Sequence, residues 1–89
     1  MVGLDFEGKT VLITGASGGI GSKTAHLFAE NDANIVVNYF SSAQKAEKTV
    51  EEVRGLGVDA FSFKADVSDP AQVSSMIKDT VNRFGAIDV

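Results

Sequence analysis

The chain has 89 residues, with twelve acidic and eight basic side chains and a formal net charge of -4. Its 44% of hydrophobic residues is typical of a globular domain and excludes intrinsic disorder, and the acidic balance argues against binding to nucleic-acid backbones. The absence of cysteine excludes a disulfide scaffold, and no apolar run approaches the ~20 residues that span a bilayer. We therefore expect a cytoplasmic protein that does not enter a membrane.

The first half of the chain alternates between short β-branched runs and a helical pattern. Residues 9–14 (KTVLIT) predict a buried strand, residues 15–21 (GASGGIG) a glycine-rich turn, and residues 34–39 (NIVVNY) a second strand. A helix is expected between the turn and about Asn31. Its inward face is predicted to hold Ile20, Thr24, Leu27, Phe28 and Asn31, with Ala25 and Ala29 nearby.

The second half continues the alternation. Residues 41–44 (SSAQ) fit a capping box that opens a second helix, which ends at Gly55, and residues 60–65 (AFSFKA) predict a third strand. Residues 69–72 (DPAQ) are a strong start for a third helix, which ends at Gly85. The inward residues expected of the second helix are Ala46, Val50 and Val53, and those of the third are Val73, Met76, Ile77, Thr80, Val81 and Phe84.

This order of elements predicts an α/β fold. Strands that alternate with helices form a parallel sheet with right-handed crossovers, here a partial doubly wound, Rossmann-like βαβαβα unit. Residues 87–89 are interpreted as the start of a fourth strand that pairs beside the first. Without a complete fourth strand, residues 11–14 would form an exposed edge, so we expect self-association or pairing with a further half of the fold.

The glycine-rich turn lies between a strand and a helix, where a dinucleotide-binding loop is expected. Gly15 permits a sharp exit from the strand, Gly18 and Gly19 let the backbone approach a diphosphate, and Gly21 lets the helix pack closely. The helix start offers free N–H groups to an anion. A Walker loop does not fit, because Ile20 stands where its second glycine is required. The alternative is a tight turn that binds nothing.

The same turn resembles the signature TGxxxGxG of the short-chain dehydrogenase/reductase family, with Thr14, Gly15, Gly19 and Gly21 in place. The segments 65–69 (ADVSD) and 84–89 (FGAIDV) are also similar to family motifs. The spacing of Gly15, Gly18 and Gly21 fits the extended branch too, but residues 38–42 (NYFSS) resemble the single-domain branch, which includes 3-oxoacyl-carrier-protein reductases and sugar dehydrogenases. The resemblance implies hydride transfer between a nicotinamide cofactor and a small carbonyl or alcohol substrate.

The resemblance also predicts the cofactor contacts. An NAD site needs a carboxylate at the end of the second strand, and the residue there is Tyr39, so NADP is favoured over NAD. Ser41 and Ser42 can donate hydrogen bonds to the 2′-phosphate; Gly18 supplies no charge where many NADP-dependent members carry a basic residue, and Lys45 could substitute. Asp66 would accept from the adenine amino group. The predicted contacts are Gly15, Ser17, Gly18, Gly19, Ile20, Gly21, Asn38, Tyr39, Phe40, Ser41, Ser42, Asp66 and Val67.

The catalytic residues of the family, in a Ser…Tyr-x-x-x-Lys pattern, have no match here. The one tyrosine, Tyr39, is followed four residues later by Ala43, and the lone His26 makes a poor metal site. We therefore expect residues 1–89 to be the N-terminal, dinucleotide-binding half of an oxidoreductase, cut before the catalytic half and inactive alone. The alternatives are a standalone nucleotide-binding or assembly module and a structural fragment without cofactor.

Overall fold

The strand β2 (Asn34–Tyr39) lies at the centre of the sheet, between β1 (Thr10–Ile13) and β3 (Ala60–Lys64). This arrangement comes from a computed structural model, which describes residues 6–15 and 19–89. Both pairings are parallel, and Val37 lies opposite Ile13 on one side and Ser62 on the other. The predicted α/β fold with a parallel sheet is confirmed.

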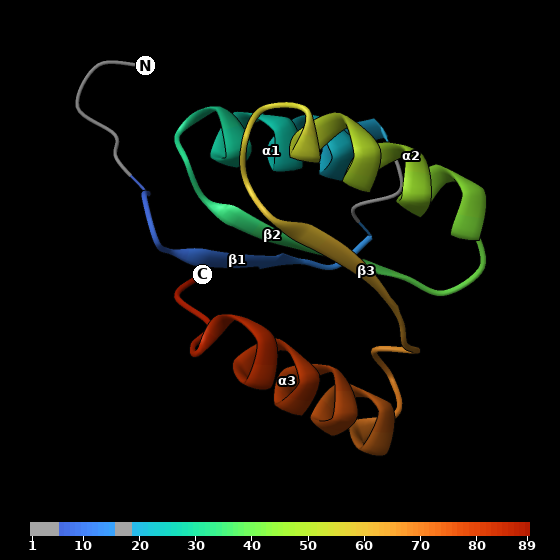
Figure 1. The fold of residues 1–89 in the computed structure, drawn as a ribbon. Helices are drawn as coiled ribbons and strands as arrows, with labels where there is room; N and C mark the ends of the chain where they lie inside the picture. Colours follow the sequence, from blue (N-terminus) through green and yellow to red (C-terminus); the bar gives the residue numbers. More distant parts are fainter. Residues whose placement is uncertain (1–5, 16–18) are drawn as a thin grey trace.

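Three helices cover the two faces of the sheet (Figure 1). Helices α1 (Gly19–Glu30) and α2 (Ala43–Arg54) lie on one face, and α3 (Pro70–Phe84) lies on the other. Right-handed crossovers from β1 to β2 and from β2 to β3 run in the same direction across the sheet and therefore place both helices on one face. A helix that returns toward β1 must use the opposite face, which is where α3 lies.

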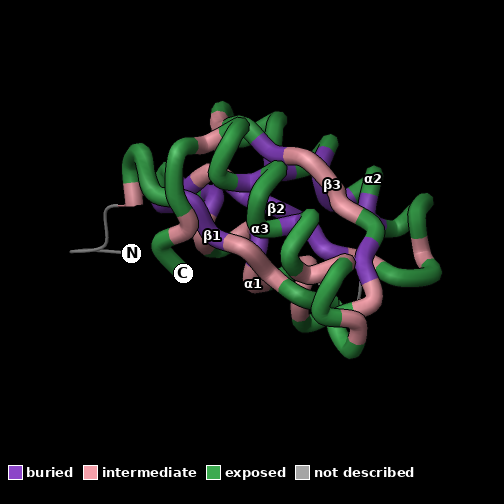
Figure 2. The backbone as a smooth tube through the Cα atoms, turned by 90° about the horizontal axis from the view of Figure 1, so that it is seen from below, coloured by how far each residue is buried: buried purple, intermediate pink, exposed green. Residues whose placement is uncertain are grey.

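The main core lies between the sheet and the pair α1 and α2. Alternate residues of β2, Ile35 and Val37, point into this core, whereas Val36 points to the α3 face, and none of the three is exposed to solvent. Figure 2 shows that buried residues run continuously along the middle of β2. The buried residues of this core are Val11, Ala25, Ala29, Ala33, Ile35, Val37, Ala46, Val50, Val53 and Ala60.

The expected inward face of α1 is partly wrong. Ile20 is 86% exposed and Leu27 is 44% exposed, whereas the buried residues of the helix are Ala25 and Ala29. Small side chains let the axis of α1 approach the sheet closely, and this packing outweighs the larger transfer free energy of the longer apolar residues. Phe28 is half-buried and packs edge-to-face on Phe6, with 5.1 Å between ring centroids.

The second helix begins one residue later than the capping box predicts. Its N-cap is Ser42, whose side chain makes no capping hydrogen bond, so the expected pairing of Ser41 with Gln44 is wrong. The inward residues Ala46, Val50 and Val53 are buried as expected, and the helix ends before Gly55. The helix is positioned by this apolar stripe, which does not depend on its cap.

The third helix begins and ends as the sequence predicts. At its start, Asp69 Oδ1 accepts a hydrogen bond of 3.0 Å from the backbone N–H of Ala71, and Pro70 occupies the first turn. At its end, Gly85 has a left-handed φ of 88°, which a side chain would disfavour. Of the predicted stripe, Met76 and Thr80 are buried, whereas Ile77 and Val81 are each more than 40% exposed. None of the helices in the described ranges is long and apolar enough to cross a membrane.

The last residues of the chain lie along the outer edge of β1. The backbone N–H of Asp88 donates to the carbonyl oxygen of Thr10 at 2.9 Å, and the N–H of Leu12 donates to the carbonyl oxygen of Val89 at 2.9 Å. The Asp88 carboxylate also accepts from the N–H of Thr10. Residues 88–89 therefore occupy the predicted place of a fourth strand and cover part of the β1 edge, although this segment is not a regular strand.

The N-cap of α3 gives a direct test of this local structure. We expect Asp69→Ala to lower the free energy of unfolding by about 1 kcal/mol, because the N–H of Ala71 loses its acceptor. Asp79→Ala, at an exposed position of the same helix, is the matched control and should be neutral or stabilising, since alanine favours a helix interior. Urea unfolding measures both changes, and equal effects of the two substitutions would contradict the capping role.

Candidate functional site

The carboxyl ends of the three parallel strands meet at one edge of the sheet, as the register requires. A cleft of about 340 Å³ lies at this edge, between the segments that follow β1, β2 and β3. Eight of the predicted contacts line it, together with Thr14 and Ala65. The eight are Gly15, Asn38, Tyr39, Phe40, Ser41, Ser42, Asp66 and Val67.

Gly15 of the glycine-rich segment lines the cleft, and α1 begins at Gly19. Gly15 has a φ of 66°, a left-handed conformation that favours glycine. Gly19, Ile20 and Gly21 form the first residues of α1 and do not line the cleft. A Cβ added at Gly19 would meet no atom within 4 Å, so packing within the described chain does not require a glycine there. The predicted contacts Ser17 and Gly18 lie outside the described residues.

At the end of β2, a buried amide holds two strands together. Asn38 is 3% exposed, and its Nδ2 donates to the carbonyl oxygens of Phe63 at 3.3 Å and Ala65 at 3.2 Å. The backbone N–H of Ala65 in turn donates to the carbonyl oxygen of Tyr39 at 2.9 Å. Asn38 therefore positions the walls of the cleft by fixing the end of β3 against the end of β2.

The segment after β2 supplies an apolar ring and two hydroxyl groups. Phe40 lines the cleft and is 59% exposed. Ser41 and Ser42 follow it, and because neither side chain caps α2, both hydroxyl groups remain available to a ligand. Neither hydroxyl group forms a hydrogen bond within the described chain.

At the end of β3, Asp66 is held by a short turn. Its Oδ1 accepts hydrogen bonds from the Ser68 hydroxyl at 2.6 Å and from the Ser68 backbone N–H at 2.9 Å. These two bonds, the hydroxyl bond first, lower the pKa of the Asp66 carboxyl group below its usual range. Gln72 of α3 also accepts from the N–H of Asp66 at 2.8 Å, so the start of α3 orients this residue.

Ser68 and Gln72 were not predicted as members of the site. An Asp followed two residues later by Ser is the pattern of a side-chain-to-backbone turn, and it could have indicated the role of Ser68. The role of Gln72 at Asp66 could not be predicted in this way, because the sequence suggested only a pairing of Gln72 with Asp69. The structure contains that pairing as well, since Gln72 Nε2 donates to Asp69 Oδ2 at 3.0 Å.

Asp66 is the single charged residue among the ten that line the cleft. No acidic side chain follows β2, and the segment there offers serine hydroxyl groups. The described residues contain no group of three or more His, Asp or Glu side chains that could hold a metal ion. The cleft therefore has hydrogen-bond donors at the β2 end and an acceptor at the β3 end.

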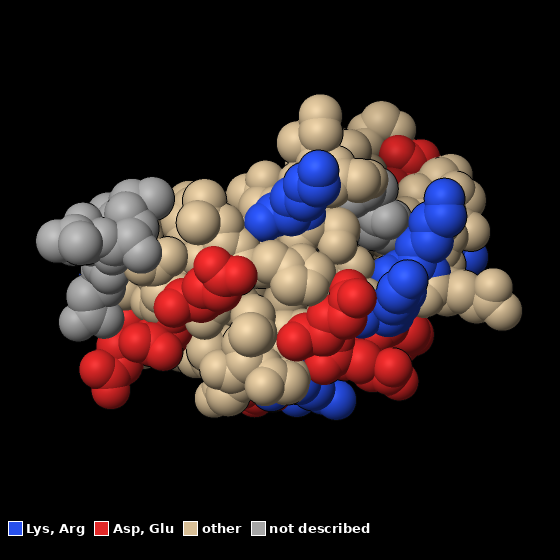
Figure 3. Space-filling model, turned by 90° about the horizontal axis from the view of Figure 1, so that it is seen from above, with Lys and Arg blue, Asp and Glu red and all other residues tan. Residues whose placement is uncertain are grey.

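A larger groove of about 730 Å³ lies on the outer surface between α1 and α2. Acidic and basic side chains are interspersed on this face (Figure 3). His26 pairs there with Glu52, at 3.4 Å between Nε2 and Oε1, and its Nδ1 lies 2.7 Å from the carbonyl oxygen of Ser22. The His26 ring therefore contacts residues of both helices. We place the candidate site at the strand ends, because there the backbone of three elements converges.

The comparisons with known proteins agree with this fold. The sequence model of the short chain dehydrogenase family matches residues 9–89, and the chain belongs to this family. It is 48% identical over 81 residues to the 3-oxoacyl-[acyl-carrier-protein] reductase FabG of Staphylococcus aureus (strain Mu50 / ATCC 700699), covering 91% of this chain and 33% of that protein. It is 42% identical over 83 residues to versicolorin reductase 1 of Aspergillus parasiticus, covering 93% of this chain and 32% of that protein.

Solved structures give the same result. A short chain dehydrogenase from Burkholderia cenocepacia J2315, in complex with NADP, superimposes with a TM-score of 0.89 at 34% identity, covering 93% of this chain and 34% of that one. The family predicted from the glycine-rich turn is thus confirmed. The chain spans about a third of the length of the curated relatives that it matches.

The hydrogen bonds of Asp66 predict its titration. We expect the Asp66 pKa, followed by carboxyl-carbon NMR, to lie below the usual range of aspartate and to rise in Ser68→Ala, which removes the hydroxyl donor. Because the folded-state pKa is depressed, its contribution to stability is present at neutral pH and is lost as the pH falls through that pKa. Ser75→Ala, on the exposed face of α3, should leave the titration unchanged. An unaltered Asp66 pKa in Ser68→Ala would refute this account.

Proposed function

We propose that residues 1–89 form the cofactor-binding half of an NAD(P)-dependent short-chain oxidoreductase, and that the cofactor is NADP in preference to NAD. In the whole protein, hydride would pass between the nicotinamide ring and a small carbonyl or alcohol substrate. All the residues assigned here are cofactor contacts. We propose hydride transfer for a whole protein of which residues 1–89 are a part, because the relative from Staphylococcus aureus is about three times as long as this chain.

One observation carries the proposal: the cleft has a carboxylate at the β3 end and none at the β2 end. A carboxylate after β2 suits the ribose 2′-hydroxyl of NAD and would repel the 2′-phosphate of NADP. Ser41 and Ser42 provide hydroxyl donors at that position, without competition from helix capping. The NADP complex of the Burkholderia cenocepacia relative supports the same choice.

The remaining contacts follow from the walls of the cleft. The Asp66 carboxylate would accept from the adenine amino group through Oδ2, since Oδ1 is engaged by Ser68. Phe40 and Val67 are 59% and 55% exposed and line the cleft, so they offer apolar surface to the adenine ring. The backbone from Gly15 to Gly21, including Ser17 and Gly18, would hold the diphosphate.

The location and assembly of the protein are part of the proposal. We place it in the cytoplasm, on the basis of its cysteine-free composition. Association with a second copy or with a further half of the fold would use the outer edge of β1. Residues 88–89 accept hydrogen bonds from the N–H groups of Thr10 and Leu12 at this edge, whereas Thr14 is exposed.

Gly19 tests where the diphosphate binds. Gly19→Ala should leave thermal stability unchanged or higher, because its Cβ meets no atom of the described residues within 4 Å and alanine favours a helix. It should weaken binding of 2′,5′-ADP by about ten-fold, or about 1.4 kcal/mol, because the Cβ would enter the space proposed for the diphosphate. Isothermal titration measures the affinity. If a stable Gly19→Ala variant binds 2′,5′-ADP with unchanged affinity, the glycine-rich segment does not contact the diphosphate.

Tyr39 tests the preference for NADP. Tyr39→Asp and Tyr39→Asn lose the same packing against the core, but only the aspartate adds a charge at the end of β2. We expect the aspartate variant to bind 2′,5′-ADP about ten-fold more weakly than the asparagine variant, with little difference between them for 5′-ADP. If both variants bind 2′,5′-ADP equally, the 2′-phosphate does not lie beside this position. If neither ligand binds the unaltered chain, the proposed function itself fails.

A further inference from the structure

Side chains form hydrogen bonds with some of the backbone groups along the outer edge of β3. Within the described chain β3 pairs with β2 on one side, and its other side faces no strand. The N–H of Ile35 donates to the carbonyl oxygen of Asp59, and the N–H of Ala65 donates to that of Tyr39. Because the direction of backbone groups alternates along a strand, Ala60, Ser62 and Lys64 direct their N–H and C=O groups away from β2. These three residues would pair with an added strand.

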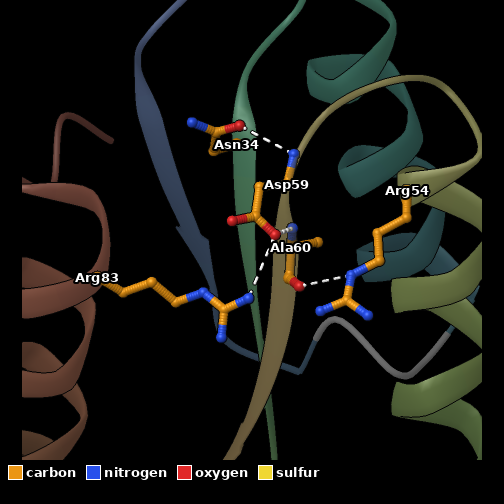
Figure 4. A network of polar contacts seen from close by, with 5 residues as sticks. All are labelled: Asn34, Arg54, Asp59, Ala60 and Arg83. Atoms are coloured by element: carbon orange, nitrogen blue, oxygen red, sulfur yellow. Dashed lines mark hydrogen bonds and ion pairs between the residues drawn. The ribbon is translucent and has the colours of Figure 1, made fainter.

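Both outward groups of Ala60 are already engaged. Its N–H donates to Asp59 Oδ1 at 2.8 Å, and its carbonyl oxygen accepts from Arg54 Nε at 2.9 Å. Ala60 itself is fully buried. Figure 4 shows Arg54 reaching this position from α2. A strand that added at this edge would have to displace a charged donor and a charged acceptor, which form stronger hydrogen bonds than neutral groups.

A second arginine holds the same edge from the opposite face of the sheet. Arg83 of α3 places Nη2 3.3 Å from Asp59 Oδ1 (Figure 4). Its guanidinium carbon lies 4.8 Å from the centroid of the Phe61 ring. Asn34 Oδ1 accepts from the N–H of Asp59 at 3.0 Å and thereby fixes the start of β3. The two arginines thus come from helices on the two faces of the sheet and meet at one end of its outer strand.

The rest of the edge is short and charged. The outward backbone groups of Ser62 and Lys64 have no hydrogen-bond partner in the described ranges, and they are the part of the edge that stays open. The Ser62 hydroxyl donates to Glu47 of α2, and Lys64 is exposed. A regular added strand needs more than two residues of pairing, and a lysine at an edge disfavours it further.

We infer that Arg54 and Arg83, through Ala60 and Asp59, close the β3 edge against strand addition by a second copy of this chain. Edge strands with free backbone groups are templates for pairing with other chains, and proteins commonly protect them with charged side chains. The observation is independent of the cofactor site, because this cluster lies at the amino end of β3 and the cleft lies at its carboxyl end. The inference therefore stands whether or not the cleft binds NADP.

The test compares two double variants that lose the same charge from the same helices. Arg54→Ala with Arg83→Ala should self-associate to a greater extent than the unaltered chain at the same concentration, and sedimentation velocity should detect larger species than any that the unaltered chain forms through its β1 edge. Lys48→Ala with Lys78→Ala, at exposed positions of α2 and α3, is the matched control and should behave as the unaltered chain. Association of both double variants to the same extent would overturn the inference.

A proline separates strand addition from association caused by loss of fold. Ser62→Pro removes an N–H that points away from β2, so it should leave the ladder between β2 and β3 intact. Added to Arg54→Ala with Arg83→Ala, it should restore the sedimentation of the unaltered chain, with circular dichroism to confirm the fold. Association that persists with proline at position 62 would show that it does not proceed through β3. If the double variant unfolds, the single variants are compared with Lys48→Ala and Lys78→Ala in the same way.

Discussion

The parallel pairing of β2 between β1 and β3 is the constraint on which the rest of the structure depends. Ile35, Val36 and Val37 are fully buried, so both faces of the sheet must be covered. Parallel strands need long crossovers, and right-handed crossovers place α1 and α2 on one face and return α3 on the other. The same geometry brings all three carboxyl ends to one edge, where the cleft lies.

The chemistry of the cleft depends on side chains that do not need to touch a ligand. Asn38 ties the end of β3 to β2, and Ser68 and Gln72 orient Asp66. With one acceptor of Asp66 engaged in this turn, its other carboxylate oxygen remains for a ligand. The absence of a capping bond at Ser42 likewise leaves a hydroxyl group available at the opposite wall. The atoms that position the cleft thus differ from those that we propose as cofactor contacts.

The two ends of the sheet carry different kinds of polar groups. At the carboxyl ends, loops leave hydroxyl and carboxylate groups open toward the cleft. At the amino ends of β2 and β3, Asn34, Asp59, Arg54 and Arg83 use their polar atoms on the backbone and on one another (Figure 4). Binding requires available hydrogen-bonding groups, whereas protection of an edge strand requires that they be occupied.

Local signals in the sequence were sufficient for much of the fold. The β-branched runs and the Asp-Pro start of α3 each depend on residues close together in the chain, and both appear in the part of the chain that the structure describes. The family was also readable, because the spacing of Thr14, Gly15, Gly19 and Gly21 reflects how one turn must pass from a strand to a helix. Eight of the thirteen predicted contacts lie together at the cleft because parallel strands share one carboxyl edge.

Contacts between distant segments could not be read from the chain alone. The choice of Ala25 and Ala29 over Ile20 and Leu27 as the buried face of α1 depends on how closely the helix approaches the sheet. The two hydrogen bonds that Asn38 donates to Phe63 and Ala65, and the contact of Arg83 with Asp59, join residues 24 to 27 positions apart. The sequence by itself determined the order and type of the elements and the family, because these follow from short-range patterns. Only the tertiary structure decided which polar groups are engaged and which are left for a ligand, because their partners become neighbours only when the sheet is assembled.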